Sequence, residues 1–374
     1  MQPELSHWNP KNAFEAEDSY AYYQKELKQT ILWLANHPSF VMMTFGNELW
    51  TGDLGRQRMD AMIELAHSLD LTRMYANGSN AYYGTIGGDA KSDFYTSQKY
   101  FTDDLRGTFA AMPGDERIQG YINNRYPSAA VNYDESMKHL RETYAKPVFS
   151  FEVGQFEVLP DFDELEEFHG ISDPANLRLI QEKAEKLGLM KQWKRYVEAT
   201  GEISRIGYRE EVEAAMRTED MSGISLLGLQ DFPGQGTALV GMINSHMESK
   251  PFDFAKPEHF ASFFRAQLPL VALPKYTYEV GETLEAEVRI ANYGKEDLTG
   301  PVTYCLEGAD VKQCGELPAV TCPAGGITAA GKIRIALDRI AQAVRLDLTV
   351  EQAGICNRYP IWVYPAVRPV CPAE

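Results

Sequence analysis

The chain of 374 residues lacks the features that would assign it to a membrane or to nucleic acid. No apolar run approaches the length that spans a bilayer, and the N-terminal MQPELSHWNP has no apolar signal core. Basic residues are in deficit, since 36 Lys and Arg face 53 Asp and Glu for a net charge of −17. A negative surface repels nucleic acid and anionic membranes, so neither is expected as a partner. As given, the sequence predicts a cytoplasmic protein, and a periplasmic or secreted location stays open if the N-terminus is truncated.

Cysteine is also scarce and confined to the last quarter of the chain, at Cys305, Cys314, Cys322, Cys356 and Cys371. The number is odd and no CxxC pair occurs, so neither a disulfide framework nor a zinc site is indicated. We expect buried free thiols or one incidental bridge. The histidines show no metal-ligand spacing and no Gly-rich phosphate loop occurs, so neither a metal nor a cofactor is predicted.

What is present is an alternation of helical and strand-like segments over residues 1–265. Such alternation is typical of βαβ units and a parallel sheet. Helices are expected at 21–36, 58–69 and 134–144, and strands at 40–45, 73–77, 93–96, 148–151 and 222–229. Residues 160–222 read as a helical insertion, with helices at 177–188, 190–200 and 210–217. The insertion is either a solvated decoration or a substrate lid.

Residues 266–374 have a different pattern and predict a second domain, an all-β sandwich of the immunoglobulin-like kind. Short alternating runs are separated by turn signals, and they lie at 277–280, 285–291, 302–306, 333–337, 345–350 and 359–364. The length of the chain agrees with two domains.

Two glutamates stand at the ends of buried strand-like runs. Glu48 ends FVMMTFGNELW, and Glu152 lies in VFSFEVGQF. In a parallel α/β barrel the strand ends form the rim on which active sites are built. Two facing carboxylates there can cleave a glycosidic bond. Two alternatives stay open: Glu48 is an ordinary surface carboxylate, or Glu157 takes the place of Glu152 in the pair.

The runs Asn36-His37-Pro38-Ser39 and Gly46-Asn47-Glu48 resemble glycoside hydrolase family 2, the family of β-galactosidases, β-glucuronidases and β-mannosidases. The segments Ser150–Gln155, Leu229–Gly241 and Asn357–Pro365 are similar to later parts of the same family, so the resemblance covers essentially the whole chain. It implies a (β/α)8 barrel in which residues 40–48 form strand four and 223–231 form strand eight. Only a helix and a polar lead-in precede residue 40, so we expect an incomplete barrel of strands four to eight. Two explanations are open: upstream domains are missing from this chain, or the barrel is completed by another chain, such as a second copy in a homo-oligomer.

The resemblance implies that Glu48 is the general acid/base and Glu152 the nucleophile of a retaining mechanism. The acid must be protonated at working pH, which needs partial burial or a neighbouring carboxylate, and the nucleophile must be ionised. Asn47 would bind the sugar 2-OH, although a role as a turn residue is the alternative.

Further substrate-binding residues are expected at the rim. Tyr95 would bond to the nucleophile, and Gln230 and Asp231 would hold sugar hydroxyls, although Asp231 could equally cap the turn before Pro233. One or two of the rim aromatics would stack on sugar faces, the rest being core or lid residues, and these aromatics are Trp50, Tyr82, Tyr83, Phe156 and Phe232.

The sequence therefore predicts a retaining exo-β-glycosidase with a carbohydrate substrate, most similar to β-galactosidases. The Gln230-Asp231-Phe232-Pro233 run lacks the Asn-x-Lys motif of glucuronidases. Two alternatives stay open. One is a catalytically incompetent fragment that binds carbohydrate or assists assembly, and the other is a transglycosylase.

Overall fold

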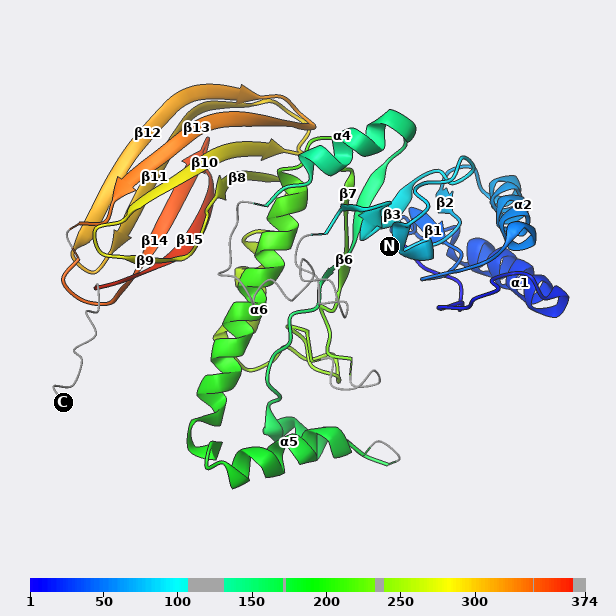
Figure 1. The fold of residues 1–374 in the computed structure, drawn as a ribbon, viewed down its shortest axis with the longest axis horizontal. Coiled ribbons are helices and arrows are strands. Elements are labelled where there is room, and N and C mark those ends of the chain that lie inside the picture. The colour runs from blue at the N-terminus through cyan, green and yellow to red at the C-terminus, as the bar shows by residue number, and fades with distance from the viewer. Residues whose placement is uncertain (107–130, 171–172, 233–238, 339, 366–374) are drawn as a thin grey trace, which may run out of the picture. The chain divides into compact units, whose positions relative to one another are not determined.

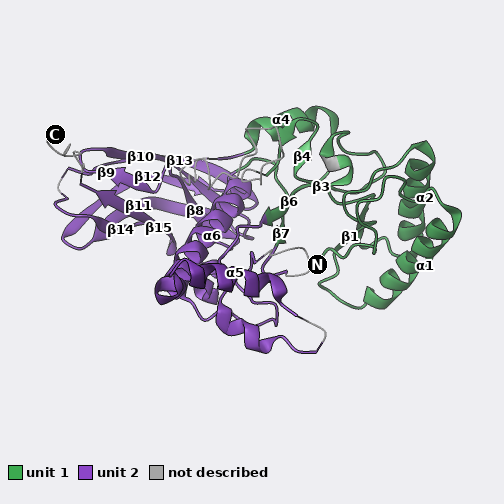
Figure 2. Cartoon of the chain, turned by 60° about the horizontal axis from the view of Figure 1, so that its bottom comes forward, with its two compact units in different colours: residues 1–106, 133–153, 218–227 green, residues 107–132, 154–217, 228–374 purple. Residues whose placement is uncertain are grey.

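The computed structural model describes residues 1–106, 131–170, 173–232, 239–338 and 340–365. The chain divides into two compact units (Figure 2). Unit 1 comprises residues 1–106, 133–153 and 218–227, and unit 2 comprises 107–132, 154–217 and 228–374. The predicted domain boundary at residue 266 remains a prediction, because the sandwich shares unit 2 with the helices of the insertion.

Unit 1 alternates short strands with helices, as predicted. Its helices are α1 (Glu17–Leu34), α2 (Asp53–Leu69), α4 (Asp134–Thr143) and the 3-10 turn η1 (Ala81–Gly84). Its strands are β1 (Met42–Thr44), β2 (Met74–Ala76), β3 (Tyr95–Ser97), β4 (Lys99–Tyr100), β5 (Asp103–Asp104), β6 (Val148–Gly154, whose last residue belongs to unit 2) and β7 (Gly223–Leu227). Helix α2 buries one apolar face, at Met59, Met62, Ile63 and Ala66, because these residues recur at helical spacing.

The barrel strands of unit 1 lie beside one another in chain order, whereas β4 and β5 form a separate antiparallel pair. β1 pairs with β2 in parallel, β3 pairs with β6 in parallel, and β7 lies beside β6. The amide of Asn80, just after β2, donates to the carbonyl of Thr96 in β3 (2.9 Å). Unit 1 is therefore part of a parallel α/β barrel, with the carboxyl ends of the strands on one rim.

The lead-in before α1 corrects one prediction. The sequence pattern predicts no strand before residue 40, yet residues 3–9 run parallel to β1. Leu5 donates to the carbonyl of Thr44 (3.2 Å), Thr44 to that of Pro3 (3.2 Å), and Asn47 to that of His7 (2.9 Å). This strand has no apolar pattern in the sequence, because Glu4, Ser6 and Trp8 are exposed at the barrel's open edge. The described barrel therefore has six consecutive strand positions instead of five.

The insertion belongs to unit 2 up to residue 217 and contains one helix fewer than predicted. Its elements are η3 (Phe162–Glu167), α5 (Ala175–Lys186), η4 (Met190–Gln192) and α6 (Trp193–Met216), and η5 (Asp253–Ala255) and α7 (Pro257–Ala261) follow later in unit 2. The two helices predicted over 190–200 and 210–217 are one continuous helix, α6. Gly201 and Gly207 lie inside it because the rings of Phe254 and Phe156 occupy the space that a side chain would need.

The C-terminal part of unit 2 is the predicted β-sandwich (Figure 1). One sheet has the order β13-β10-β8 and the other β12-β11-β14-β15-β9. The strands are β8 (Gln267–Ala272), β9 (Thr277–Glu279), β10 (Thr283–Asn292), β11 (Leu298–Gly308), β12 (Val311–Cys322), β13 (Gly326–Ala336), β14 (Val344–Gln352) and β15 (Ile355–Tyr364). β12 was not predicted because it is an edge strand with mostly exposed residues, and β8 was missed because its run is continuously apolar. The immunoglobulin-like subtype remains a prediction.

Cysteine forms one bridge, one of the two outcomes expected. Cys305 and Cys314 face each other across β11 and β12 and are joined by a disulfide. Cys322 is buried and free, and Cys356 is exposed and free. Cys371 lies outside the described residues.

A buried ion pair connects α6 to the sandwich within unit 2. Arg209 Nε lies 3.0 Å from Glu213 Oε1, and both side chains are almost fully excluded from solvent. Glu213 also accepts hydrogen bonds from Tyr359 Oη (2.6 Å) and Asn357 Nδ2 (2.9 Å), while Arg209 donates to Asn357. These bonds satisfy a carboxylate that would otherwise be costly to bury.

We therefore predict that Glu213→Ala destabilises unit 2 by about 3–5 kcal/mol, since it leaves the Arg209 guanidinium buried without its counter-ion. Urea unfolding of the full chain measures this. Glu285→Ala is the matched control, because the Glu285–Arg334 pair is exposed and should contribute less than about 1 kcal/mol. Equal losses in the two variants would contradict the prediction.

Candidate active site

The backbone turns sharply at both glutamates. Glu48 and Glu152 have φ values of 55° and 57°, which are unusual for residues other than glycine. Before Glu48, Gly46 has φ 134°, and a β-carbon there would lie 2.3 Å from the carbonyl oxygen of His7. Glycine is thus required for the lead-in strand to approach β1. Such strain at a strand end agrees with a functional site.

The two carboxylates accept hydrogen bonds from different side chains of unit 1. Asn47 Nδ2 donates to Glu152 Oε1 (3.4 Å), and Gln98 Nε2 donates to Glu152 Oε2. Glu48 Oε2 accepts a hydrogen bond from Trp8 Nε1 (2.9 Å). The structure therefore brings together Asn47, Glu48 and Glu152, which the sequence predicted as a group.

The electrostatics of the site centre on Glu152. Burial raises the pKa of its carboxyl from the ordinary 4.5 to about 7. The guanidinium of Arg106 opposes this rise, whereas the charge of Glu48 adds to it. The interaction between the two glutamates agrees with a shared site. We expected the proposed nucleophile to be ionised, yet at neutral pH this pKa leaves about half of Glu152 protonated.

Two other predicted residues of unit 1 have structural contacts. Tyr95 donates its hydroxyl to the carbonyl of Lys99 (2.6 Å), so the bond to the nucleophile that we predicted for Tyr95 is made by Gln98 instead. Trp50 packs edge-on against Tyr82, with ring centroids 5.4 Å apart. The side chain of Tyr83 lies outside the described residues.

The predicted residues of unit 2 also have local partners. Asp231 is buried and pairs with Lys250 Nζ (2.8 Å), which favours neither of its predicted roles. Gln230 donates to the carbonyl of Ser245 (3.2 Å), and Phe156 packs against Tyr208. Phe232 is exposed, and residues 233–238 of the predicted last barrel segment lie outside the described residues.

The sequence analysis missed Trp8, Gln98 and Arg106. Gln98 directly follows β3, so the rule that strand ends carry function would have found it had the strand been extended to Ser97. Trp8 was missed together with the lead-in strand. Arg106 is buried beside no recognisable motif, and no signal in the sequence marked it.

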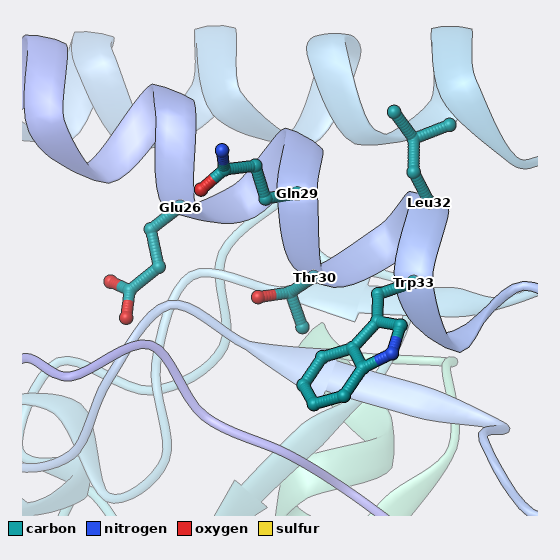
Figure 3. A pocket seen from close by; sticks show the side chains of 5 residues that line it. All are labelled: Glu26, Gln29, Thr30, Leu32 and Trp33. Atoms are coloured by element: carbon teal, nitrogen blue, oxygen red, sulfur yellow. The ribbon is translucent and has the colours of Figure 1, made fainter.

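The part of the chain that the structure describes shows neither a metal-binding cluster of His, Cys, Asp or Glu nor a helix long and apolar enough to cross a membrane. One surface pocket of unit 1 lies along α1 and is lined by Glu26, Gln29, Thr30, Leu32 and Trp33 (Figure 3). Its residues come from one helix and include none of the predicted site residues.

The raised pKa of Glu152 predicts a pH dependence of stability. Between pH 4.5 and 7 the folded state keeps a proton that the unfolded chain has lost, so stability falls as pH rises through this window. Above pH 7 the buried, ionised carboxylate of Glu152 lowers the free energy of unfolding by its full amount, about 3 kcal/mol. Glu152→Gln has no such charge, so it should be more stable than the wild type at pH 8 but not at pH 4.5.

Denaturant unfolding at a series of pH values checks this difference. Glu157→Gln is the control, because Glu157 is exposed and its replacement should give a difference that does not vary with pH. A difference for Glu152→Gln that stays constant from pH 4.5 to 8 would contradict the burial argument.

Comparison with known proteins identifies the barrel. Residues 4–160 match the family described as "Glycosyl hydrolases family 2, TIM barrel domain", and residues 282–365 match a domain of unknown function. No curated protein matches. The first of these matches covers the lead-in strand as well as β1, β2, β3 and β6.

Two solved structures of one enzyme support the fold. The chain is similar to Amycolatopsis orientalis exo-chitosanase CsxA, with a TM-score of 0.53 and 12% identity over 96% of this chain and 42% of that one. A complex of a variant of that enzyme with PNP-beta-D-glucosamine gives a TM-score of 0.54 at 11% identity, with the same coverage. The apo Bacteroides uniformis beta-glucuronidase 3 gives 0.45 at 16% identity, covering 98% of this chain and 42% of that one. The chain thus spans 42% of the length of these structures. Residues 4–160 are thus similar to a family 2 TIM-barrel domain, and the chain is similar in fold to part of these structures.

Proposed function

We propose that this chain contains the catalytic residues of a retaining exo-β-glycosidase. The observation that supports this most directly is the single contact network joining Asn47 to Glu152 beside Glu48, at the ends of β6 and β1. These residues are the ones that the family motif places in catalysis. Their convergence in unit 1 needs no residue of the sandwich.

In the proposed reaction Glu152 attacks the anomeric carbon and forms a covalent glycosyl-enzyme. Glu48 donates a proton to the glycosidic oxygen as the bond to the leaving group breaks. Glu48 then removes a proton from water, which attacks the same carbon and releases Glu152 with overall retention. Asn47 Nδ2 orients Glu152 before attack, and its buried Oδ1, which has no hydrogen-bond partner among the described residues, is a second polar atom beside the reacting groups.

For the sugar, a β-galactoside is our first candidate, on the resemblance of the motifs alone. A β-glucosaminide is the second, because the similar exo-chitosanase variant forms a complex with PNP-beta-D-glucosamine. A panel of p-nitrophenyl β-glycosides distinguishes them. A binding or assembly role without catalysis is the alternative function.

Replacement of either glutamate should abolish release of p-nitrophenol from the preferred glycoside, by about 10³-fold or more, because each takes part in bond cleavage. Glu157→Ala is the control and should retain wild-type activity, since its side chain is exposed. Retention of activity in Glu48→Ala or Glu152→Ala would contradict the assignment of that residue.

Azide separates the two roles. In Glu48→Ala, azide should replace water in the second step and give the β-glycosyl azide from an activated β-glycoside. In Glu152→Ala, azide should take the place of the missing nucleophile and give the α-glycosyl azide. NMR of the products identifies each anomer, and exchanged products would mean that the two roles are reversed.

The pKa of Glu152 also predicts the acid limb of activity. Only ionised Glu152 can attack, so kcat/KM should rise with pH with a midpoint of about 7. The profile is measured with an activated glycoside, so that proton donation is not limiting. A midpoint near 4.5 would show that Glu152 is not held in a buried environment.

A further inference from the structure

Trp8 is a large aromatic side chain that is both exposed and bonded to the candidate site. Its side chain is 63% exposed, yet its indole N–H donates to Glu48 Oε2 at 2.9 Å. A tryptophan has a flat apolar face and one N–H donor, so its ring can stack on a ligand while its polar edge stays bonded to the protein. The hydrogen bond places one edge of this ring beside the proposed acid/base.

The backbone around Trp8 is held by a series of hydrogen bonds. Trp8 pairs in parallel with Asn47, and the amide of Asn9 donates to the carbonyl of Asn47 (2.9 Å). The amide of Trp50 donates to the carbonyl of Pro10 (3.1 Å). These bonds join the lead-in strand to the segment after β1 around Trp8. They hold the backbone of Trp8 in a defined position relative to Glu48.

The chemistry at Glu48 indicates which part of a substrate would meet this ring. A general acid bonds to the glycosidic oxygen, which lies between the sugar and the leaving group. Glu152 and Asn47 contact each other on the sugar side in the proposed reaction. The Trp8 indole donates its N–H to Glu48, the residue that would meet the glycosidic oxygen, and not to Glu152, so we assign the ring to the leaving-group side.

We propose that Trp8 is the platform that binds the leaving-group part of the substrate and positions Glu48 for proton donation. This inference rests on the proposed function. The ligand class is a β-glycoside whose leaving group has a flat apolar face, such as an aryl group or a second sugar ring. Such faces stack on indole rings because both surfaces lose water. Trp8 is a positioning and specificity-determining residue in this account.

The chain provides a matched control in Trp33. It is also an exposed tryptophan of unit 1, with 80% of its surface accessible, but it lines the pocket on α1 (Figure 3). No site residue is among the lining residues of that pocket. Trp33→Ala therefore removes an exposed indole without changing the contacts of Glu48.

The first experiment measures binding alone, on the full chain. Non-hydrolysable phenyl 1-thio-β-glycosides and the matching methyl 1-thio-β-glycosides are titrated by isothermal calorimetry. Phenyl compounds should bind more tightly than methyl compounds to the wild type and to Trp33→Ala. Trp8→Ala should weaken phenyl binding roughly tenfold and leave methyl binding unchanged. Equal weakening of both ligands, or no phenyl preference in the wild type, overturns the inference.

The second experiment separates the two parts of the role. Trp8→Phe keeps a ring but lacks the N–H, so KM for phenyl glycosides should stay near the wild-type value. Its kcat should fall for poor leaving groups and stay unchanged for dinitrophenyl glycosides, which depart without a proton. A kcat that falls equally for both leaving groups overturns the positioning role.

The outcomes also distinguish this inference from the proposed function. Loss of phenyl binding in Trp8→Ala in a chain with no hydrolytic activity would support the platform and refute catalysis. Hydrolysis that depends on Glu48 and Glu152, with no change in KM in Trp8→Ala, would support catalysis and refute the platform.

Discussion

The parallel pairing of the lead-in strand with the end of β1 is the contact on which the candidate site depends. Asn47 is at its centre, because its backbone pairs with residues on both sides of Trp8 while its side chain reaches Glu152. Glu48 is the next residue along the chain and bonds to Trp8. This strand pairing therefore sets the positions of Glu48 and of the exposed indole, and it directs the amide of Asn47 to Glu152, which β6 supplies.

The site combines backbone strain with a costly buried charge. Glu48 and Glu152 both adopt positive φ values, and burial raises the pKa of Glu152 to about 7. Neither feature stabilises the fold, and each is held by surrounding contacts with residues such as Gln98 and Arg106. The buried carboxylate of Glu213 in unit 2 is stabilised differently, because it has a counter-ion, Arg209, and two further hydrogen-bond donors. A buried carboxylate with a raised pKa beside a second carboxylate is suited to chemistry, whereas one paired directly with a buried guanidinium is suited to holding α6 on the sandwich.

Much of this arrangement could be predicted from sequence, for physical reasons that differ between elements. Buried strands such as β1 and β6 are apolar runs with clear ends, so the positions of Glu48 and Glu152 at the rim followed from pattern and motif. The lead-in strand is an edge, and its exposed polar residues carry no such signal. Asp231 pairs with Lys250, which lies 19 residues further along the chain, and no local sequence pattern predicts such an ion pair. Tyr95 was placed on the correct strand, but the direction of its hydroxyl depends on the turn after β3.

The central claim is that Glu152 forms a covalent bond with the sugar while Glu48 serves as acid and base. An activated 2-deoxy-2-fluoro-β-glycoside tests it most directly, because the fluorine slows breakdown of the glycosyl-enzyme and lets it accumulate. Peptide mass spectrometry of the full chain should find one fluorosugar attached to Glu152 and none on the Glu152→Ala variant. A label on Glu157 or Glu48, or a chain that hydrolyses the substrate without ever being labelled, would contradict the account.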